Sequence, residues 1–190
     1  MNRVTWTATI LTFALASCGS PEATDGSGEA PAAPQPAPPP PAARAMRAVA
    51  MLRTADGTAA GSATATAAGG QVAIVLQVQG LPPGEHGVHV HMTGRCDGPT
   101  FESAGGHWNP TNATHGLEDP AGQHAGDMPN LTVGADGAGT LEYQLVGGSF
   151  DGLMDADGSA FVVHASADDQ RSDPSGNSGD RIACGVFERG

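Results

Sequence analysis

Short stretches of alternating apolar and polar residues, separated by glycine-containing turns, recur through residues 46–190. In the clearest stretch, Gln71 to Gln79, every second residue is aliphatic, which is typical of a β-strand with one buried face. Weaker versions occur around Val49, Val88, Leu141, Phe161 and Ile182. Hairpin turns are indicated at Asp56-Gly57, Gly69-Gly70 and Asp136-Gly137. The pattern predicts an all-β fold of about eight short antiparallel strands, either a barrel or a sandwich.

Two long segments, 104–130 and 165–180, interrupt this pattern. Both are rich in small and turn-forming residues and have neither a helical nor a strand period. Loops of this length are uncommon in a compact domain unless something organises them, because ordering them costs conformational entropy. Few apolar residues are present to offset that cost, so a bound metal ion is the favoured organiser.

The chain has seven histidines, more than packing ordinarily needs. His89 and His91 are two apart in a strand-like stretch, so their side chains point from the same face. Such a pair alone is more often a surface feature than a metal site. Six histidines with Asp127, however, can serve two ions if one imidazole is shared: four nitrogens for copper, three nitrogens and an oxygen for zinc. These six are His89, His91, His107, His115, His124 and His164.

The N-terminal residues predict export. Residues 1–17 have a short positive start followed by an apolar run from Val4 to Leu15, too short to span a bilayer. Leu15-Ala16-Ser17-Cys18 resembles the lipobox of bacterial lipoproteins, which implies cleavage before Cys18 and a lipid on its sulfur. An ordinary signal peptide with an incidental cysteine is the alternative. Residues 18–45, with many Pro and Ala, indicate an extended linker. We expect a lipoprotein on the periplasmic side, anchored to the outer membrane through this lipid alone.

Two cysteines remain after Cys18. In an oxidising compartment, Cys96 and Cys184 favour a disulfide. Free thiols that bind metal are the alternative, although the spacing has no C-x-x-C character.

The charge balance excludes some partners. The chain has no lysine, and its 8 arginines face 20 acidic residues, giving a net charge of −12 with histidines neutral. Nucleic-acid binding needs a basic face, so we expect none. Attraction to anionic lipid surfaces is excluded on the same ground.

Several segments, taken in chain order, resemble the copper–zinc superoxide dismutases. The resemblance covers residues 46–190, which we take as one domain, and any single segment would be weak evidence. The segments are Gly87-Val88-His89-Val90-His91, Ser103 to Pro110, His115-Gly116, His124 to Leu131, Phe161 to Asp169, and Gly179 to Gly185.

The resemblance implies an eight-stranded antiparallel Greek-key β-barrel with two long functional loops. It implies one copper per subunit, bound by His89, His91, His107 and His164. It also implies one zinc per subunit, bound by His107, His115, His124 and Asp127. His107 would then bridge the two ions.

The resemblance further implies an enzyme that dismutates superoxide to dioxygen and hydrogen peroxide. His107 and Arg181 would be its catalytic residues, with Arg181 holding the anionic substrate. Asp168 would accept hydrogen bonds from ligands of both metals. Cys96 and Cys184 would form the intrasubunit disulfide.

One departure from the family concerns the second loop. Lysines and glutamates that steer superoxide in eukaryotic members are missing, and residues 165–181 hold four aspartates against Arg171 and Arg181. We therefore expect weak long-range attraction of the substrate anion.

Three alternatives stay open at this point. One is a lipoprotein that sequesters or delivers copper and zinc without turnover, although storage needs neither Arg181 nor a shared histidine. A second is a copper-only dismutase, which the complete zinc set disfavours. A structural protein is the weakest, because it leaves the histidines unexplained. Monomer and homodimer are equally compatible with the sequence.

Overall fold

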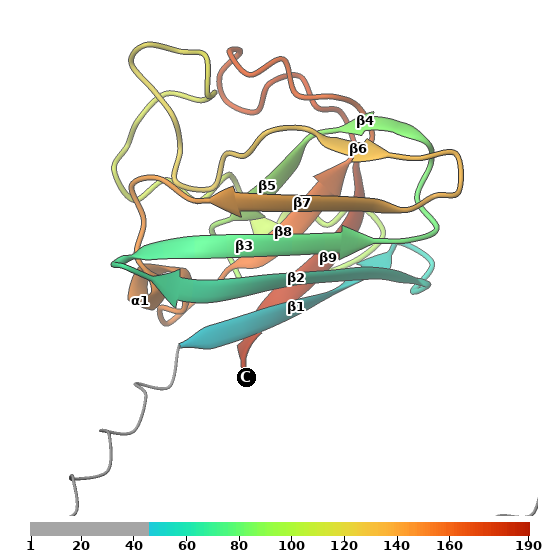
Figure 1. Cartoon of the computed structure of the whole chain (residues 1–190), viewed down its shortest axis with the longest axis horizontal. Helices are drawn as coiled ribbons and strands as arrows, with labels where there is room; N and C mark the ends of the chain where they lie inside the picture. Colours follow the sequence, from blue (N-terminus) through green and yellow to red (C-terminus); the bar gives the residue numbers. More distant parts are fainter. Residues whose placement is uncertain (1–45) are drawn as a thin grey trace, which may run out of the picture. The chain divides into compact units, whose positions relative to one another are not determined.

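Residues 46–190 are described by the computed structural model, and they form an all-β domain, as predicted (Figure 1). The proposed signal peptide, Cys18 and the linker lie outside the described residues. Two short helical turns occur in the domain, η1 (Glu102–Ala104) and α1 (Phe150–Leu153). None of the helices in 46–190 has the length and hydropathy needed to cross a membrane. The strands are β1 (Arg47–Thr54), β2 (Ala59–Ala68), β3 (Gln71–Val78), β4 (Gly84–His86), β5 (Val88–His91), β6 (Leu131–Val133), β7 (Gly139–Gln144), β8 (Ala160–His164) and β9 (Arg181–Arg189).

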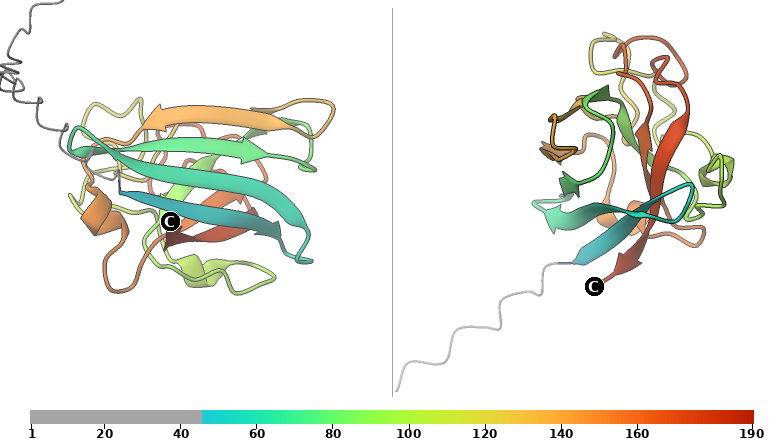
Figure 2. Two further views of the ribbon diagram at one scale, coloured as in Figure 1. Left: turned by 60° about the horizontal axis from the view of Figure 1, so that its bottom comes forward. Right: turned by 90° about the vertical axis from the view of Figure 1, so that its right-hand side faces the viewer.

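Seven of these strands form one antiparallel sheet in the order β5-β8-β9-β1-β2-β3-β7, and β4 pairs with β6. The large sheet curls around the core, and the β4–β6 pair lies beside β7 (Figures 1 and 2). The pairs β3–β7, β5–β8 and β1–β9 join strands that are distant in sequence, as Greek-key connections require. The topology agrees with the predicted barrel architecture.

Nine strand segments occur where about eight were expected, because the sequence indicated neither β4 nor β6, each only three residues long. Gly87 separates β4 from β5. The chain pairs with β6 before this residue and with β8 after it. A Cβ atom at Gly87 would lie 2.6 Å from the Ser178 hydroxyl oxygen, so only glycine allows the second loop to approach this closely. The absence of a side chain at Gly87 therefore leaves room for the second loop.

The core is aliphatic and small-residue rich. All four aliphatic residues that alternate along β3, from Val72 to Val78, are buried in it. Strand β8 is buried on both faces, because Phe161 and Val163 enter the main core while Ala160 and Val162 pack under the segment around Phe101. Its end, where His164 lies, is thereby fixed on both sides.

The predicted segments 104–130 and 165–180 contain no strand or helix, except that Ala104 is the last residue of η1. Backbone hydrogen bonds connect the first of them to β5: Trp108 donates to the Val90 carbonyl at 2.8 Å, and Val90 donates to the Gly126 carbonyl at 3.0 Å. The second segment is anchored where Gly87 donates to the Ser166 carbonyl at 2.8 Å. Both loops therefore lie against the strand that carries His89 and His91.

The predicted disulfide joins Cys96 to Cys184 of β9, across 88 residues of sequence. It attaches the segment before η1 to the central part of the sheet. The free-thiol alternative is thereby wrong.

Removal of the disulfide tests its contribution to stability. In the chain-entropy model, a closed loop of this length stabilises the folded state by about 4–5 kcal/mol. We expect the double variant Cys96→Ala, Cys184→Ala to lose about that much free energy of unfolding in urea titration. Reduced wild-type protein is the control and should match the variant. Equal stability of the oxidised and reduced proteins would contradict the expectation.

Candidate metal centre

Four buried histidines form the first ligand cluster. His89 and His91 come from β5, His107 from the first loop, and His164 from the end of β8. One ring nitrogen from each lies within 4.8 Å of the others. The apolar residues Val88 and Val90, which alternate with the β5 histidines, point into the core. The strand period therefore directs both imidazoles to the same side, under the loops.

The hydrogen bonds of these rings identify which nitrogen is available to a metal. His89 Nε2 lies 2.6 Å from Asp168, His91 Nδ1 lies 2.9 Å from the Gly105 carbonyl, and His164 Nδ1 lies 3.1 Å from the Gly179 carbonyl. The opposite nitrogens of these rings, together with His107 Nε2, are buried and have no hydrogen-bond partner within residues 46–190. Unpaired buried polar atoms are costly, and these all belong to one cluster. Four such imidazole nitrogens fit a copper ion.

The second cluster consists of His107, His115, His124 and Asp127. Asp127 Oδ1 lies 2.9, 3.2 and 3.3 Å from the Nδ1 atoms of His107, His115 and His124, in that order. The Nδ1 atoms of His107 and His124 are 3.4 Å apart. Ligands about 2.0–2.1 Å from zinc in a tetrahedral site are separated by roughly 3.3 Å. The donor types and their spacing therefore fit zinc.

His107 belongs to both clusters. Its Nδ1 faces Asp127, and its Nε2 is the unpaired atom in the first cluster. Its ring stacks on that of His89, with centroids 3.8 Å apart. One imidazole thus directs a nitrogen into each cluster, the arrangement that the resemblance implied for His107.

Asp168 connects the two clusters. Its Oδ2 lies 2.6 Å from His89 Nε2, and its Oδ1 lies 3.1 Å from His115 Nε2. Asn130 holds the backbone of Asp168 through two hydrogen bonds of 2.9 and 2.8 Å. Sequence reasoning assigned no role to Asn130, because the pairing depends on how the two loops pack. A Cβ at Gly176 would lie 1.7 Å from Asp168 Oδ1, so the second loop passes directly over this link.

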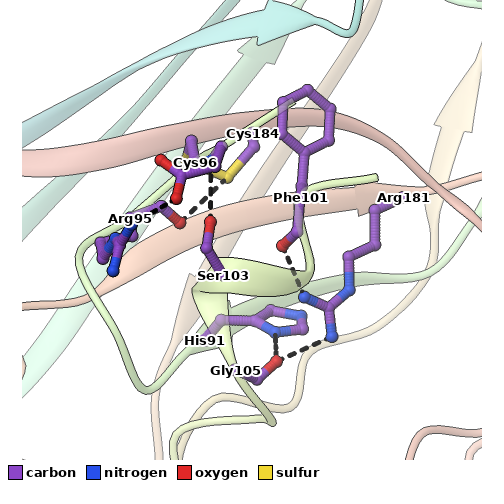
Figure 3. The surroundings of a disulfide bond; sticks show 9 residues. His91, Arg95, Cys96, Phe101, Ser103, Gly105, Arg181 and Cys184 are labelled. Carbon is purple, nitrogen blue, oxygen red and sulfur yellow. Dashed lines mark hydrogen bonds and ion pairs between the residues drawn. A yellow bond between two sulfur atoms is a disulfide. The ribbon is translucent and has the colours of Figure 1, made fainter. Parts of the chain in front are cut away.

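Arg181 lies beside the first cluster. Its guanidinium donates to the Phe101 carbonyl and to the Gly105 carbonyl, both at 2.7 Å (Figure 3). Gly105 is also the hydrogen-bond partner of His91. Arg181 lines a cavity of about 370 Å³ together with His91, His107, His124 and His164. A larger cavity of about 810 Å³ also contacts Arg181 but is lined by none of the histidines.

The seventh histidine, His86, lies outside both clusters. Its ring nitrogens face the carbonyls of His164 and Pro82 at 2.7 and 2.8 Å. It supports the backbone of His164 and is not a ligand in either set.

Burial lowers the pKa values of the ligand histidines, whereas contacts with carboxylates raise them. Burial lowers the pKa of His89 to about 3 and that of His164 to about 4. Burial alone would lower the pKa of His115 as well, but its contacts with Asp127 and Asp168 outweigh this and raise it to about 9. Without metal, the rings of the first cluster are therefore neutral at pH 7, the state that binds metal.

The comparisons with known proteins agree with this geometry. The family model described as copper/zinc superoxide dismutase matches residues 57–187. The chain belongs to this family.

The similar proteins described here come from bacteria. A protein named "Superoxide dismutase [Cu-Zn]" from Caulobacter vibrioides is 43% identical over 148 residues, covering 74% of this chain and 85% of the relative. "Superoxide dismutase-like protein YojM" from Bacillus subtilis is 48% identical over 120 residues, which cover 60% of this chain and 61% of that protein. The crystal structure of a double mutant of a SOD-like protein from Bacillus subtilis matches with a TM-score of 0.67 and 43% identity, covering 73% of this chain and 95% of that one. Family membership supports binding of copper and zinc at the two clusters.

The lowered histidine pKa values predict acid sensitivity of the metal-free protein. His89 and His164 titrate near 6.5 when unfolded but near 3 and 4 when folded. The unfolded chain therefore binds more protons below pH 6.5, and the free energy of unfolding must fall as the pH drops through this range. The raised pKa of His115 acts mainly above this window, because its contribution to stability is complete below about pH 6.5 and is lost as the pH rises from there to about 9.

Urea unfolding of the metal-free protein at about pH 7 and about pH 5 measures this change. The midpoint should be lower at the acidic pH. NMR titration should show both rings still neutral there, and protonation of His89 or His164 near pH 6.5 in the folded protein would contradict the assignment.

Proposed function

We propose that this chain is an enzyme that dismutates superoxide to dioxygen and hydrogen peroxide. The observation that carries the proposal is the cavity that contains both Arg181 and the shared imidazole of His107. A storage site needs metal ligands alone. A guanidinium beside the ligands and a ring with one nitrogen in each cluster are what catalysis on a small anion would require.

When bound, one copper per subunit would supply a centre that exchanges single electrons, and one zinc per subunit would hold the other nitrogen of His107. Two superoxide anions and two protons give one dioxygen and one hydrogen peroxide. The guanidinium of Arg181 is charged at any working pH and can hold the anion. His107 lines the same cavity, and its buried Nε2, which has no hydrogen-bond partner within residues 46–190, can hold a proton for the product.

The surrounding residues keep these groups in place. The Phe101 and Gly105 carbonyls fix the guanidinium, and Asp168 fixes rings of both clusters. Such fixed orientation reduces the reorganisation needed when substrate arrives.

Substitution of Arg181 tests the proposal. Wild-type protein loaded with both metals should consume superoxide, as measured by stopped-flow absorbance. Arg181→Ala should lower the second-order rate constant by about 10- to 150-fold, which corresponds to one charge-assisted hydrogen bond. Arg181→Lys should retain part of the rate because it keeps the charge. Metal content is measured on every variant as the control.

A non-catalytic metal-binding protein is the alternative, and the relative named superoxide dismutase-like gives a reason to test it. In that case the wild-type protein would bind both metals and consume no superoxide. Full metal occupancy without turnover would thus favour sequestration or delivery.

The electrostatic setting supports weak steering. Arg171, the only other cation of the second loop, is paired with Glu118 of the first loop, with Arg171 Nε 2.8 Å from Glu118 Oε2. Arg181 donates to two carbonyls, which leave its charge in place. Arg181 is thus the one unpaired cation beside the first cluster among the residues of the two loops, whereas the whole chain carries a net charge of −12.

We therefore expect the rate constant for superoxide to stay constant or rise as the ionic strength increases from about 0.01 to about 0.15 M. Screening would weaken the repulsion by the acidic surface at least as much as the attraction by Arg181. Stopped-flow measurements across this range provide the check. A steep decrease in rate with salt would show that local attraction dominates.

We also propose that the protein is exported and held on the periplasmic side through a lipid on Cys18. The lipobox-like residues 15–18 and the proline-rich segment that follows support this placement.

A further inference from the structure

In most of the ligand histidines, the ring nitrogen that faces away from the clusters makes a hydrogen bond, but one ring lacks this bond. The rings of His89, His91, His115 and His164 each direct their second nitrogen to a carboxylate or carbonyl oxygen. His107 uses both nitrogens for the two clusters. Among the nitrogens that face away from the two clusters, only His124 Nε2 has no hydrogen-bond partner within residues 46–190.

The closest carboxylate to this nitrogen belongs to the second loop. Asp173 Oδ1 lies 3.8 Å from His124 Nε2, beyond hydrogen-bond distance. The same oxygen accepts the backbone N–H of His115 at 2.8 Å. Asp173 thus contacts one residue of the second cluster and approaches another. Nothing in the sequence around Asp173 distinguishes it from a solvated loop residue, and its side chain is 61% exposed.

The loop holds Asp173 at this position through a compact set of hydrogen bonds. Asp169 Oδ1 accepts the backbone N–H groups of Arg171 and Ser172 at 3.0 and 2.8 Å, and its Oδ2 accepts from Asn177 at 2.8 Å. Gly176 donates to the Ser172 carbonyl at 2.7 Å. The segment around Asp173 is therefore fixed by its own backbone and does not depend on the contact with His124.

We propose that Asp173 is a positioning residue for zinc, whose carboxylate accepts the Nε2–H of His124 when Nδ1 binds the ion. Once Nδ1 is bound to a metal, a neutral imidazole must carry its proton on Nε2, which then needs an acceptor. A carboxylate in that place orients the ring and makes it a stronger ligand. The proposal deepens the function proposed above and rests on it for the identity of the metal, but it requires no turnover of superoxide.

Removal of such a partner typically weakens metal binding by about 10- to 100-fold. Because Asp173 is largely exposed, we expect the lower end of this range, about tenfold. Binding of copper should be unaffected, since no ligand of the first cluster other than His107 belongs to the zinc set.

The test compares the full metal-loaded proteins of Asp173→Asn, Asp173→Ala and Asp180→Asn. Asp173→Asn keeps an oxygen that can accept from His115 but removes the charge, whereas Asp173→Ala removes both contacts. Asp180→Asn is the matched control, because it makes the same charge change in the same loop, and the Asp180 side chain makes no hydrogen bond or ion pair within residues 46–190. Zinc affinity is measured by competition with a chromogenic chelator, and retained copper and circular dichroism report that each variant is folded.

A second readout separates positioning from general structure. In the diamagnetic copper(I) form, the Nε2 proton of His124 is observable by NMR. We expect its signal to shift and exchange faster in Asp173→Asn, together with a zinc dissociation constant about tenfold higher, while Asp180→Asn matches wild type.

Other outcomes overturn the proposal. The proposal is wrong if Asp173→Asn binds zinc as tightly as wild type, or if Asp173→Asn and Asp180→Asn lose the same amount of zinc affinity. A loss confined to Asp173→Ala would assign the effect to the His115 contact, and an unchanged His124 signal would exclude the hydrogen bond. If wild-type protein consumes no superoxide while Asp173→Asn still weakens zinc binding, the proposed function fails and the role of Asp173 stands.

Discussion

The two clusters depend on one imidazole ring that two cations would have to share. His107 lies in the first loop, yet its position is set by β5, because His91 and His107 form a backbone bridge and Trp108 donates to Val90. The ring stacks on His89, which belongs to that same strand. The strand therefore positions both its own two ligands and the ring that joins them to the zinc set. Displacement of this ring would separate two sites that otherwise share no ligand.

Carboxylates and carbonyls around the rings complete the site. Each acceptor fixes one nitrogen of a ring and so determines which nitrogen is left for metal. Asp168 does this for one ring of each cluster, and Asn130 holds Asp168 from the first loop. The loops are thus ordered by polar contacts around the ligands, with little secondary structure of their own. This explains how long segments with few apolar residues can have a defined structure in a compact domain.

Much of this organisation is encoded locally and could be predicted. The alternation along β3, the glycine turns and the absence of regular structure in the two loops all follow from residue order. The ligand types could be grouped because their segments resemble those of a known family. The need for glycine at position 87 could not be predicted, since it depends on the approach of Ser178 from a distant loop. The contacts of Asn130 and Asp173 were missed for the same reason: a polar residue in a loop has no periodicity that indicates its partner.

The connection between Cys96, Gly105 and Arg181 has a consequence for the order of maturation. The disulfide attaches the segment before η1 to β9, the strand that begins with Arg181, and the Gly105 carbonyl after η1 accepts from both Arg181 and His91 (Figure 3). Formation of the disulfide therefore does more than lower the conformational entropy of the unfolded chain. A newly made molecule whose thiols are still reduced would have the sheet and its ligands but a less firmly held guanidinium. Covalent closure would then be the step that turns a metal-binding barrel into one prepared to receive an anion.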